Sequence, residues 1–282
     1  MVEKHLLNKM LDMVKRGGEI ALSLIDDSAP SVKPDQSILT RADLEISAFI
    51  RHSLQPEIAT TKHLLIDEED KNLAHYFDQA ILESFPYVWV VDPIDGTRSF
   101  ANKMPMFGVS IGLLKDLQPW MGAVYFPMLH ELFYCDGRDS YFVKSAFTGQ
   151  AAAVRIRPVD QEITVQSIFF GSDDYFKDYE WDERFCTVML SNSAVVDLCW
   201  PAVGRGCGSF FNSNIWDFAG SWPICQSAGL KMRSFTTGKL LDRIETGLFI
   251  GQGDMTWRCK DFYILSSERN YPLIKGQIRP KR

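Results

Sequence analysis

The chain has 282 residues, of which 36 are acidic and 30 are Lys or Arg, so its formal net charge is −6. Hydrophobic residues make up 46% and charged residues 23% of the sequence, which excludes a disordered or collagen-like chain and leaves about two domains or one large one. The acidic balance argues against nucleic acid or an anionic membrane as the main partner, because both bind basic surfaces.

The first part of the chain is predicted to form two helices followed by strands. Apolar residues recur at helical spacing over 3–27 and 42–54, with a loop containing two prolines between them. Short buried strands follow at 62–66 and 87–91, and each runs into acidic residues. Turn residues then separate four further apolar runs, which predict an antiparallel meander with strands at 107–114, 120–126, 131–135 and 141–144.

The second part begins near residue 150 and mixes strands with helices. Helices are predicted at 193–203 and 216–228, and a polar patch covers 171–183. The predicted strands of this part are 154–157, 163–169, 207–211 and 231–235. We therefore divide the chain into an N-terminal α+β half, 1–148, and a C-terminal α/β half, 149–282, that share an interface.

The sequence favours a cytoplasmic protein. The first residues lack a positive patch followed by an apolar run, and no stretch reaches the ~18 apolar residues of a spanning helix. None of the six cysteines forms a C-x-x-C pair, so free thiols in a reducing compartment are expected rather than a zinc site.

The most informative motif joins a buried strand to two acids and a Gly-Thr pair, over residues 90–97. Asp92 ends the strand, Pro93 fixes the backbone φ angle, and Asp95 follows three residues after Asp92. Two carboxylates at a strand end can hold divalent cations, which prefer oxygen ligands. The N–H groups of Gly96 and Thr97, at the start of a short helix, would face an anion such as phosphate.

Three other interpretations of this motif were weighed. A plain turn with solvated acids is disfavoured, because a fully apolar strand feeds the motif. A calcium-binding EF-hand is excluded, because its twelfth position would be Lys103 rather than Glu. A haloacid-dehalogenase-type phosphatase, which forms an aspartyl-phosphate, stays open with Asp173-Asp174 as its late acidic motif. The first two acids of that class stand two residues apart, whereas Asp92 and Asp95 stand three apart.

Two further acidic features accompany the motif. The strand at 62–66 ends in the run Asp67-Glu68-Glu69-Asp70, which is at the edge of a sheet where ligands gather. Asp217 stands at the start of an apolar helix, a position that its favourable interaction with the helix N-terminus alone could explain.

Taken together, these motifs resemble the inositol monophosphatase family, within the lithium-sensitive, magnesium-dependent phosphatase superfamily. The markers are Glu68-Glu69 after a strand, the sequence D-P-I-D-G-T from Asp92, and W-D-F-A-G from Trp216; Thr40-Arg41-Ala42-Asp43 matches the T-x-x-D of that family. The resemblance covers roughly residues 3–250. It implies an α/β fold, an αβαβα sandwich of layered α+β type, and a homodimer.

The resemblance also implies roles for individual residues. Glu68, Asp92 and the carbonyl of Ile94 would bind one Mg²⁺, and Asp92, Asp95 and Asp217 a second. Glu69 would act in catalysis, and either Glu68 or Glu69 would hold a third, weaker ion, so that each subunit holds two or three. The remaining implied roles are proton transfer from the attacking water, by Asp43 and Thr97, and phosphate binding, by the amides of Gly96 and Thr97.

This chain departs from the family pattern at the residues that would select a substrate. Asp67 replaces the usual Gly, Arg98 follows D-G-T as in the histidinol-phosphatase branch, and no acid lies between 197 and 217 to contact sugar hydroxyls. Phe210 is either a stacking surface for a ring or a core residue of a strand. By position, Asn192 and Ser193 are expected to contact substrate hydroxyls.

These observations predict a Mg²⁺-dependent phosphomonoesterase acting on a small phosphorylated metabolite, by water attack and in-line displacement. An inositol monophosphate is the first substrate to consider. A 3′(2′),5′-bisphosphate nucleotidase and a histidinol-phosphate phosphatase are the alternatives of the same superfamily. A catalytically silent regulator that binds metal or phosphate is the alternative of another class.

Overall fold

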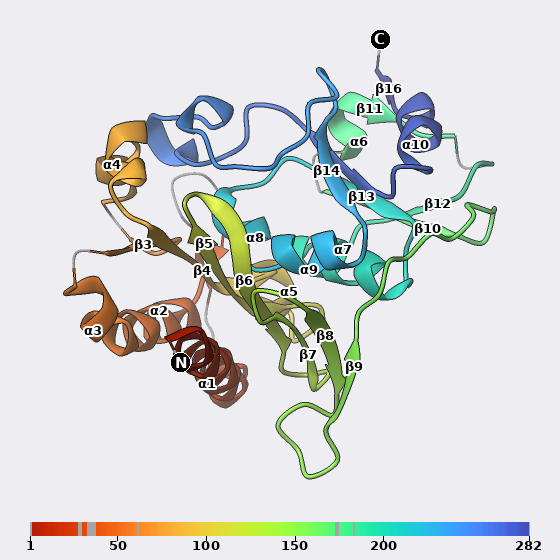
Figure 1. Ribbon diagram of the computed structural model, residues 1–282. Coiled ribbons are helices and arrows are strands. Elements are labelled where there is room, and N and C mark those ends of the chain that lie inside the picture. Colours follow the sequence, from red (N-terminus) through yellow and green to blue (C-terminus); the bar gives the residue numbers. More distant parts are fainter. Residues whose placement is uncertain are drawn as a thin grey trace.

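The computed structural model describes residues 2–27, 30–32, 38–60, 62–70, 72–172, 175–182 and 184–281. Helices and sheets alternate in five layers, as Figure 1 shows: a helical layer, a large sheet, a central helical layer, a smaller sheet and an outer helical layer. Three buried apolar clusters fill the spaces between these layers. The predicted αβαβα sandwich is confirmed.

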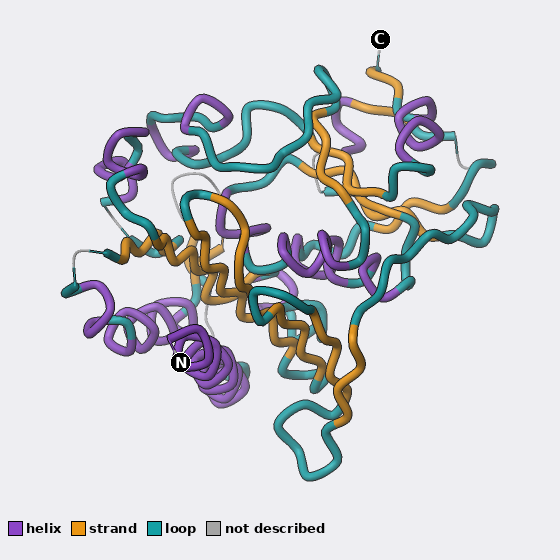
Figure 2. Tube along the Cα trace, in the orientation of Figure 1, coloured by secondary structure: helices purple, strands orange, loops and turns teal. Residues whose placement is uncertain are grey.

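The first layer consists of two long helices that lie side by side on one face of the large sheet (Figures 1 and 2). They are α1 (Val2–Leu24) and α2 (Arg41–Ser53), and the short α3 (Gln55–Ile58) follows. Residues at helical spacing, such as Met10 and Ile46, are fully buried against the sheet. The two predicted helices are therefore confirmed.

The large sheet has seven strands among the described residues, and it carries the predicted meander. β3 and β4 are parallel, whereas every later pair of neighbours is antiparallel. In spatial order the strands are β3 (His63–Asp67), β4 (Tyr87–Asp95), β5 (Gly108–Lys115), β6 (Gln118–Phe126), β7 (Glu131–Cys135), β8 (Ser140–Lys144) and β9 (Ala152–Arg155). Because β9 pairs with β8, this sheet continues past residue 148; the division into halves stays a prediction.

The central layer separates the two sheets and is made of short helices: α7 (Ala194–Cys199), α8 (Ile215–Ala219) and α9 (Trp222–Ser227). α8 contacts β4 and β5, α9 contacts β6, and α7 contacts β13 of the smaller sheet. Figure 1 shows the three helices in a row between the sheets.

Each of the two helices predicted for this layer is interrupted. The helix predicted over 216–228 is two helices that meet at Gly220, where the backbone comes so close to β5 that a Cβ atom would lie 2.4 Å from the Ser110 hydroxyl. The helix predicted over 193–203 ends as a 3₁₀ turn at Pro201, which has no N–H to continue the α-helical pattern.

The smaller sheet holds five strands within the described ranges. In spatial order they are β12 (Thr187–Met189), β10 (Ile168–Gly171), β13 (Gly208–Phe211), β15 (Tyr263–Ser266) and β14 (Lys231–Ser234). The strand predicted from residue 163 begins only at Ile168, and β12 and β15 were not predicted. The outer layer is α6 (Tyr175–Asp178), α10 (Tyr271–Gln277) and the pair β11 (Tyr179–Glu180) and β16 (Arg279–Pro280).

The remaining elements are short. Two of them flank β4: α4 (Gln79–Glu83) precedes its amino end, and α5 (Thr97–Ala101) follows its carboxyl end. The others are β1 (Ser31–Val32), β2 (Ile38–Leu39) and 3₁₀ turns at Leu73–Tyr76, Pro201–Val203, Thr246–Leu248 and Gly253–Met255. Within the described residues, no helix has the length and apolar content that crossing a membrane requires. All six cysteines are buried and unpaired.

Two glycines of the large sheet allow the central helices to approach it closely. A Cβ on Gly112 of β5 would lie 2.6 Å from the backbone of Ala219, and a Cβ on Gly122 of β6 would lie 2.1 Å from the carbonyl oxygen of Gly220. Both contacts are with backbone atoms, which cannot rotate away. The glycines therefore set the distance between the sheet and α8.

We expect Gly122→Ala to lower the free energy of unfolding by about 2 kcal/mol or more, because the new methyl group overpacks this contact. In a chain of this size the thermal midpoint would fall by about 3 °C or more, measured by calorimetry. Gly149→Ala is the matched control, because nothing lies within 4 Å of its Cβ position. Equal midpoints for the two variants would contradict this account of the contact.

Candidate metal and active site

A bulge at the end of β4 brings two carboxylates to one face of the sheet. Asp92 pairs with Ser110, but Asp95 pairs with Gly108, so β4 has one residue more than β5 over this stretch. Residues three apart in a regular strand point to opposite faces, and the extra residue restores a common face. Pro93 fits within the bulge because it has no N–H to donate to the ladder.

A tight turn follows the bulge and places Thr97. Gly96 has a φ of +80°, and a Cβ there would lie 2.7 Å from the carbonyl oxygen of Met106, so only glycine fits. The Thr97 hydroxyl donates to the carbonyl of Ile94 at 2.9 Å and lies 3.4 Å from Asp43 Oδ1. The predicted pair of Asp43 and Thr97 is therefore brought together from α2 and α5.

Asp43 and Asp217 occupy equivalent positions in their helices. Each is the third residue of its helix (N3) and closes a capping box: Asp43 Oδ2 accepts the backbone N–H of Thr40 at 2.8 Å, and Asp217 Oδ2 accepts that of Asn214 at 2.7 Å. Asp43 also accepts the Thr40 hydroxyl. The capping interpretation of Asp217 is therefore correct, and it leaves the second carboxylate oxygen for another role.

The decisive feature of the site is the convergence of three acids from two distant parts of the chain. Oxygen atoms of Asp92, Asp95 and Asp217 lie within 4.8 Å of one another. Glu68 stands beside them, because its N–H donates to the carbonyl of Val91 at 3.1 Å and so continues β3 next to Asp92.

Burial and mutual repulsion act together on these carboxylates. The pKa of Asp92 is raised well above its usual value by burial and then by the charges of Glu68, Asp95 and Asp217. Burial also raises the pKa of Asp217, followed by repulsion from Asp95 and Glu68. The pKa of Asp95 is raised to about 7, mainly by burial, although hydrogen bonds from Ser193 and Val195 oppose the shift.

The donor set fits divalent cations. Asp92 Oδ1 is buried and accepts no hydrogen bond from any described residue, which is costly for a buried polar atom unless another partner supplies the interaction. Several carboxylate oxygens at short range, together with neighbouring carbonyls, are the ligands that hard cations such as Mg²⁺ prefer. A bound cation would also offset the repulsion among the acids.

Ser193 differs from its predicted role. Ser193 is only 4% exposed. Its hydroxyl donates to Asp95 Oδ1, which also accepts the N–H of Val195 at 3.2 Å. Ser193 therefore holds Asp95 in place rather than offering its hydroxyl to a substrate. Asn192, in contrast, is exposed and lies 3.4 Å from Arg98, so its role as a substrate contact stays a prediction.

Phe210 is a core residue, and the prediction that it stacks on a substrate is wrong. Its side chain is fully buried in β13 and stacks on Phe262 at 4.7 Å between ring centroids. Tyr179 and Phe235 pack against its edges. β13 is covered on both faces and all its residues are buried, so the core interpretation left open by the sequence is the correct one.

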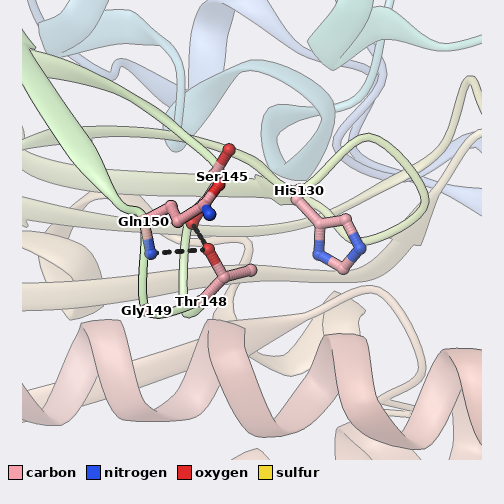
Figure 3. A pocket seen from close by; sticks show the side chains of 5 residues that line it. All are labelled: His130, Ser145, Thr148, Gly149 and Gln150. Carbon is pink, nitrogen blue, oxygen red and sulfur yellow. Dashed lines mark hydrogen bonds between the residues drawn. The ribbon is translucent and has the colours of Figure 1, made fainter.

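Asp173 and Asp174, the late acidic motif of the aspartyl-phosphate alternative, lie outside the described residues. A shallow hollow beside the β8–β9 loop, which Figure 3 shows, shares no residue with the acidic cluster. There the Thr148 hydroxyl donates to the Ser145 carbonyl at 2.6 Å and accepts the Gln150 N–H at 3.2 Å, so these groups are bonded to one another.

Sequence reasoning missed two residues of α2. Ser47 and Arg51 both contact Asp67, the acid that precedes the Glu68-Glu69 pair. The signal was present in the spacing, because residues 43, 47 and 51 recur every four positions and so lie on one face of a helix.

The sequence model of the inositol monophosphatase family matches residues 4–264. The chain belongs to this family. Among curated members it is 28% identical over 250 residues to inositol monophosphatase 1 of Solanum lycopersicum, covering 80% of this chain and 83% of the relative. It is 24% identical over 245 residues to the 3′(2′),5′-bisphosphate nucleotidase CysQ of Buchnera aphidicola, covering 84% and 87%. It is also 28% identical over 247 residues to the Nus factor SuhB of Escherichia coli, covering 82% and 87%.

Solved structures of this family share the fold. An IMPase/NADP phosphatase complexed with Mg²⁺ and phosphate superimposes with a TM-score of 0.73 at 16% identity, covering 98% of this chain and 95% of that one. The suppressor protein SuhB of Bartonella henselae superimposes with a TM-score of 0.70 at 18% identity, covering 97% and 98%.

The shifted pKa of Asp95 predicts how this family member responds to pH in EDTA. Its folded-state pKa of about 7 exceeds the usual 3.8, so between these values the folded chain holds a proton that the unfolded chain has released. The stability contributed by Asp95 is therefore present below the lower value and is lost as pH rises through about 7. We expect the thermal midpoint in EDTA to decrease as the pH is raised from about 5 to about 8, and to decrease more for the unsubstituted protein than for Asp95→Asn. A fall of the same size in both would contradict the burial of this charge.

Proposed function

We propose that the protein is a Mg²⁺-dependent phosphomonoesterase that hydrolyses a small phosphorylated metabolite. The observation that carries this proposal is the convergence of the buried Asp92 and Asp95 with the half-buried Asp217, with an oxygen of Asp92 left without a hydrogen-bond donor among the described residues. The adjacent contact between Thr97 and Asp43 adds a group that can accept a proton. Membership of the inositol monophosphatase family supports the same reaction.

The residues that would hold the cations are proposed from the resemblance. Glu68, Asp92 and the Ile94 carbonyl would hold one cation, and Asp92, Asp95 and Asp217 would hold another. Glu69 is the proposed contributor to a third, weaker ion. Bound Mg²⁺ would lower the pKa of a water molecule and stabilise the negative charge of the leaving alkoxide.

The chain's own residues supply positioning and proton transfer. We propose that the Thr97 hydroxyl accepts a proton from the attacking water and passes its own to Asp43 Oδ1, which lies 3.4 Å away. The Asp43 carboxylate is fixed for this task, because its other oxygen is held by Thr40. The amides of Gly96 and Thr97 are the proposed phosphate contacts.

The substrate is proposed from the resemblance and from the exposed residues beside Gly96. An inositol monophosphate is first, and a 3′(2′),5′-bisphosphate nucleotide or histidinol phosphate follows, since curated relatives carry the first two activities in their names. Arg98 and Asn192 are exposed beside Gly96 and are the proposed selectors. Homodimer formation and sensitivity to lithium stay predictions from the resemblance, and a cytoplasmic location stays a prediction from the sequence.

A catalytically silent regulator is the second candidate, and one named relative, a Nus factor, favours keeping it. The retained contact between Thr97 and Asp43 argues for turnover, because binding of metal or phosphate alone does not need a proton acceptor.

We expect Asp92→Asn to reduce phosphate release about 10³-fold or more, because the proposed bridging ligand loses its charge. The metal-free variant should unfold at or above the midpoint of the unsubstituted protein, since a repelled buried charge has been removed. The rise in midpoint caused by Mg²⁺ should disappear. Asp12→Asn, on the exposed face of α1, is the control and should change neither quantity. Full activity of Asp92→Asn with Mg²⁺ would overturn the proposed role.

A panel of phosphate esters separates the candidate functions. We expect phosphate release with Mg²⁺, fastest from an inositol monophosphate, when inositol phosphates, phosphoadenosine phosphate, histidinol phosphate and sugar bisphosphates are compared. Arg98→Ala should raise KM for the preferred ester with little change in kcat, because Arg98 is proposed to bind the substrate rather than the reacting atoms. No release from any ester would favour the silent regulator, and a trapped phospho-enzyme would favour the aspartyl-phosphate alternative.

A further inference from the structure

The four consecutive acids after β3 divide into an outer and an inner pair. Asp67 and Asp70 are the outer pair, and they close the turn: the Asp70 N–H donates to the Asp67 carbonyl at 2.9 Å. The Asp67 carboxylate is fully buried, and its Oδ1 accepts the N–H of Glu69 at 3.0 Å. The inner pair, Glu68 and Glu69, therefore lies on a turn that is fixed by hydrogen bonds to both the main-chain carbonyl and the side chain of Asp67.

Helix α2 holds the outer pair from the side. The Ser47 hydroxyl donates to Asp67 Oδ2 at 2.6 Å. One nitrogen of the Arg51 guanidinium lies 3.3 Å from the same oxygen, and the other lies 3.2 Å from Asp70 Oδ2. A single guanidinium thus joins the first and the last residue of the turn, which is the geometry that its planar fork suits.

The same face of α2 reaches the reacting end of the site. Asp43, Ser47 and Arg51 are four residues apart in turn, so they lie in a row along the helix. Asp43 contacts Thr97 at one end of the row, and Arg51 contacts the acidic turn at the other. One helix consequently fixes both the proposed proton acceptor and the turn that carries Glu68.

The turn is tied to the metal ligands by the sheet. The Glu68 N–H donates to the Val91 carbonyl, one residue before Asp92, so a displacement of the turn would displace Glu68 relative to Asp92. The Arg51 guanidinium also offsets the negative charges of the outer pair. A glycine at position 67, usual in the family that the sequence resembles, could make none of the side-chain contacts described for Asp67.

We propose that Arg51 and Asp67 are positioning residues that fix the Glu68–Glu69 turn and thereby raise the affinity of the site for divalent cations. The affinity part of this inference rests on the proposed function, whereas the fixing of the turn does not. Residues that orient metal ligands typically change metal affinity about 10–100-fold when they are substituted.

Arg51→Gln is the principal test, because the Arg51 side chain is 37% exposed and its loss leaves no large cavity. We expect Mg²⁺ and Mn²⁺ affinity, measured by calorimetry, to fall about 10-fold. Hydrogen exchange of the peptide covering 67–70 should become faster in EDTA. Asp67→Asn should give the same direction in both measurements, and Arg51→Lys, which can reach one of the two carboxylates, should restore part of each.

Glu57→Gln is the matched control. It breaks another partly buried ion pair of the helical layer, in which Lys9 Nζ lies 2.6 Å from Glu57 Oε1. We expect this variant to lose thermal stability while its metal affinity and the exchange of the 67–70 peptide stay unchanged. A general loss of stability would therefore not imitate the expected result.

The two measurements separate the two proposals. Unchanged exchange and unchanged affinity in Arg51→Gln would overturn this inference and leave the proposed function in place. Faster exchange with unchanged affinity would overturn the link between the turn and the cations. If the unsubstituted protein binds neither Mg²⁺ nor Mn²⁺, the proposed function is overturned together with that link, and exchange alone decides whether Arg51 fixes the turn.

Discussion

Repulsion among three clustered carboxylates, two of them buried and the third half-buried, is the constraint on which the site depends. If the surrounding structure could deform, the carboxylates of Asp92, Asp95 and Asp217 would move apart. Their raised pKa values show that protonation is the other way to relieve the repulsion. Rigid features oppose it: the bulge of β4, the close approach of α8 at Gly112 and Gly220, and the core that fills both sides of the large sheet. The fold thus holds a high local density of negative charge where hard cations find their preferred ligands.

Helix capping supplies part of this rigidity without extra residues. Asp43 and Asp217 each use one carboxylate oxygen to accept an N–H at the start of their own helix. The other oxygen of Asp43 faces Thr97, and the other oxygen of Asp217 is available to the cluster. Because the capping bond fixes the side-chain rotamer, local helix energetics and site geometry are satisfied by the same atoms. The two interpretations of Asp217 that the sequence left open are therefore compatible.

Local signals predicted the helices, the strands and the acids, the resemblance implied the layers, and long-range contacts decided what the sequence could not show. The apolar periodicity of α1 and α2 and the meander after Asp92 were readable because each follows from neighbouring residues. The bulge was not, since only the pairing with Ser110 and Gly108 reveals the extra residue. Phe210 illustrates the same limit: an aromatic in a strand has two possible environments, and the packing of Phe262 against it decides between them.

The assembly of the site from both parts of the chain has a consequence for the order of folding. The large sheet can bring Asp92 and Asp95 together before α8 has been synthesised, because their neighbours in β3 and β5 precede residue 116. Full repulsion arises only when α8 docks and Asp217 joins them. Docking of the central layer, rather than formation of the sheet, is therefore the step whose rate cations and protons should control.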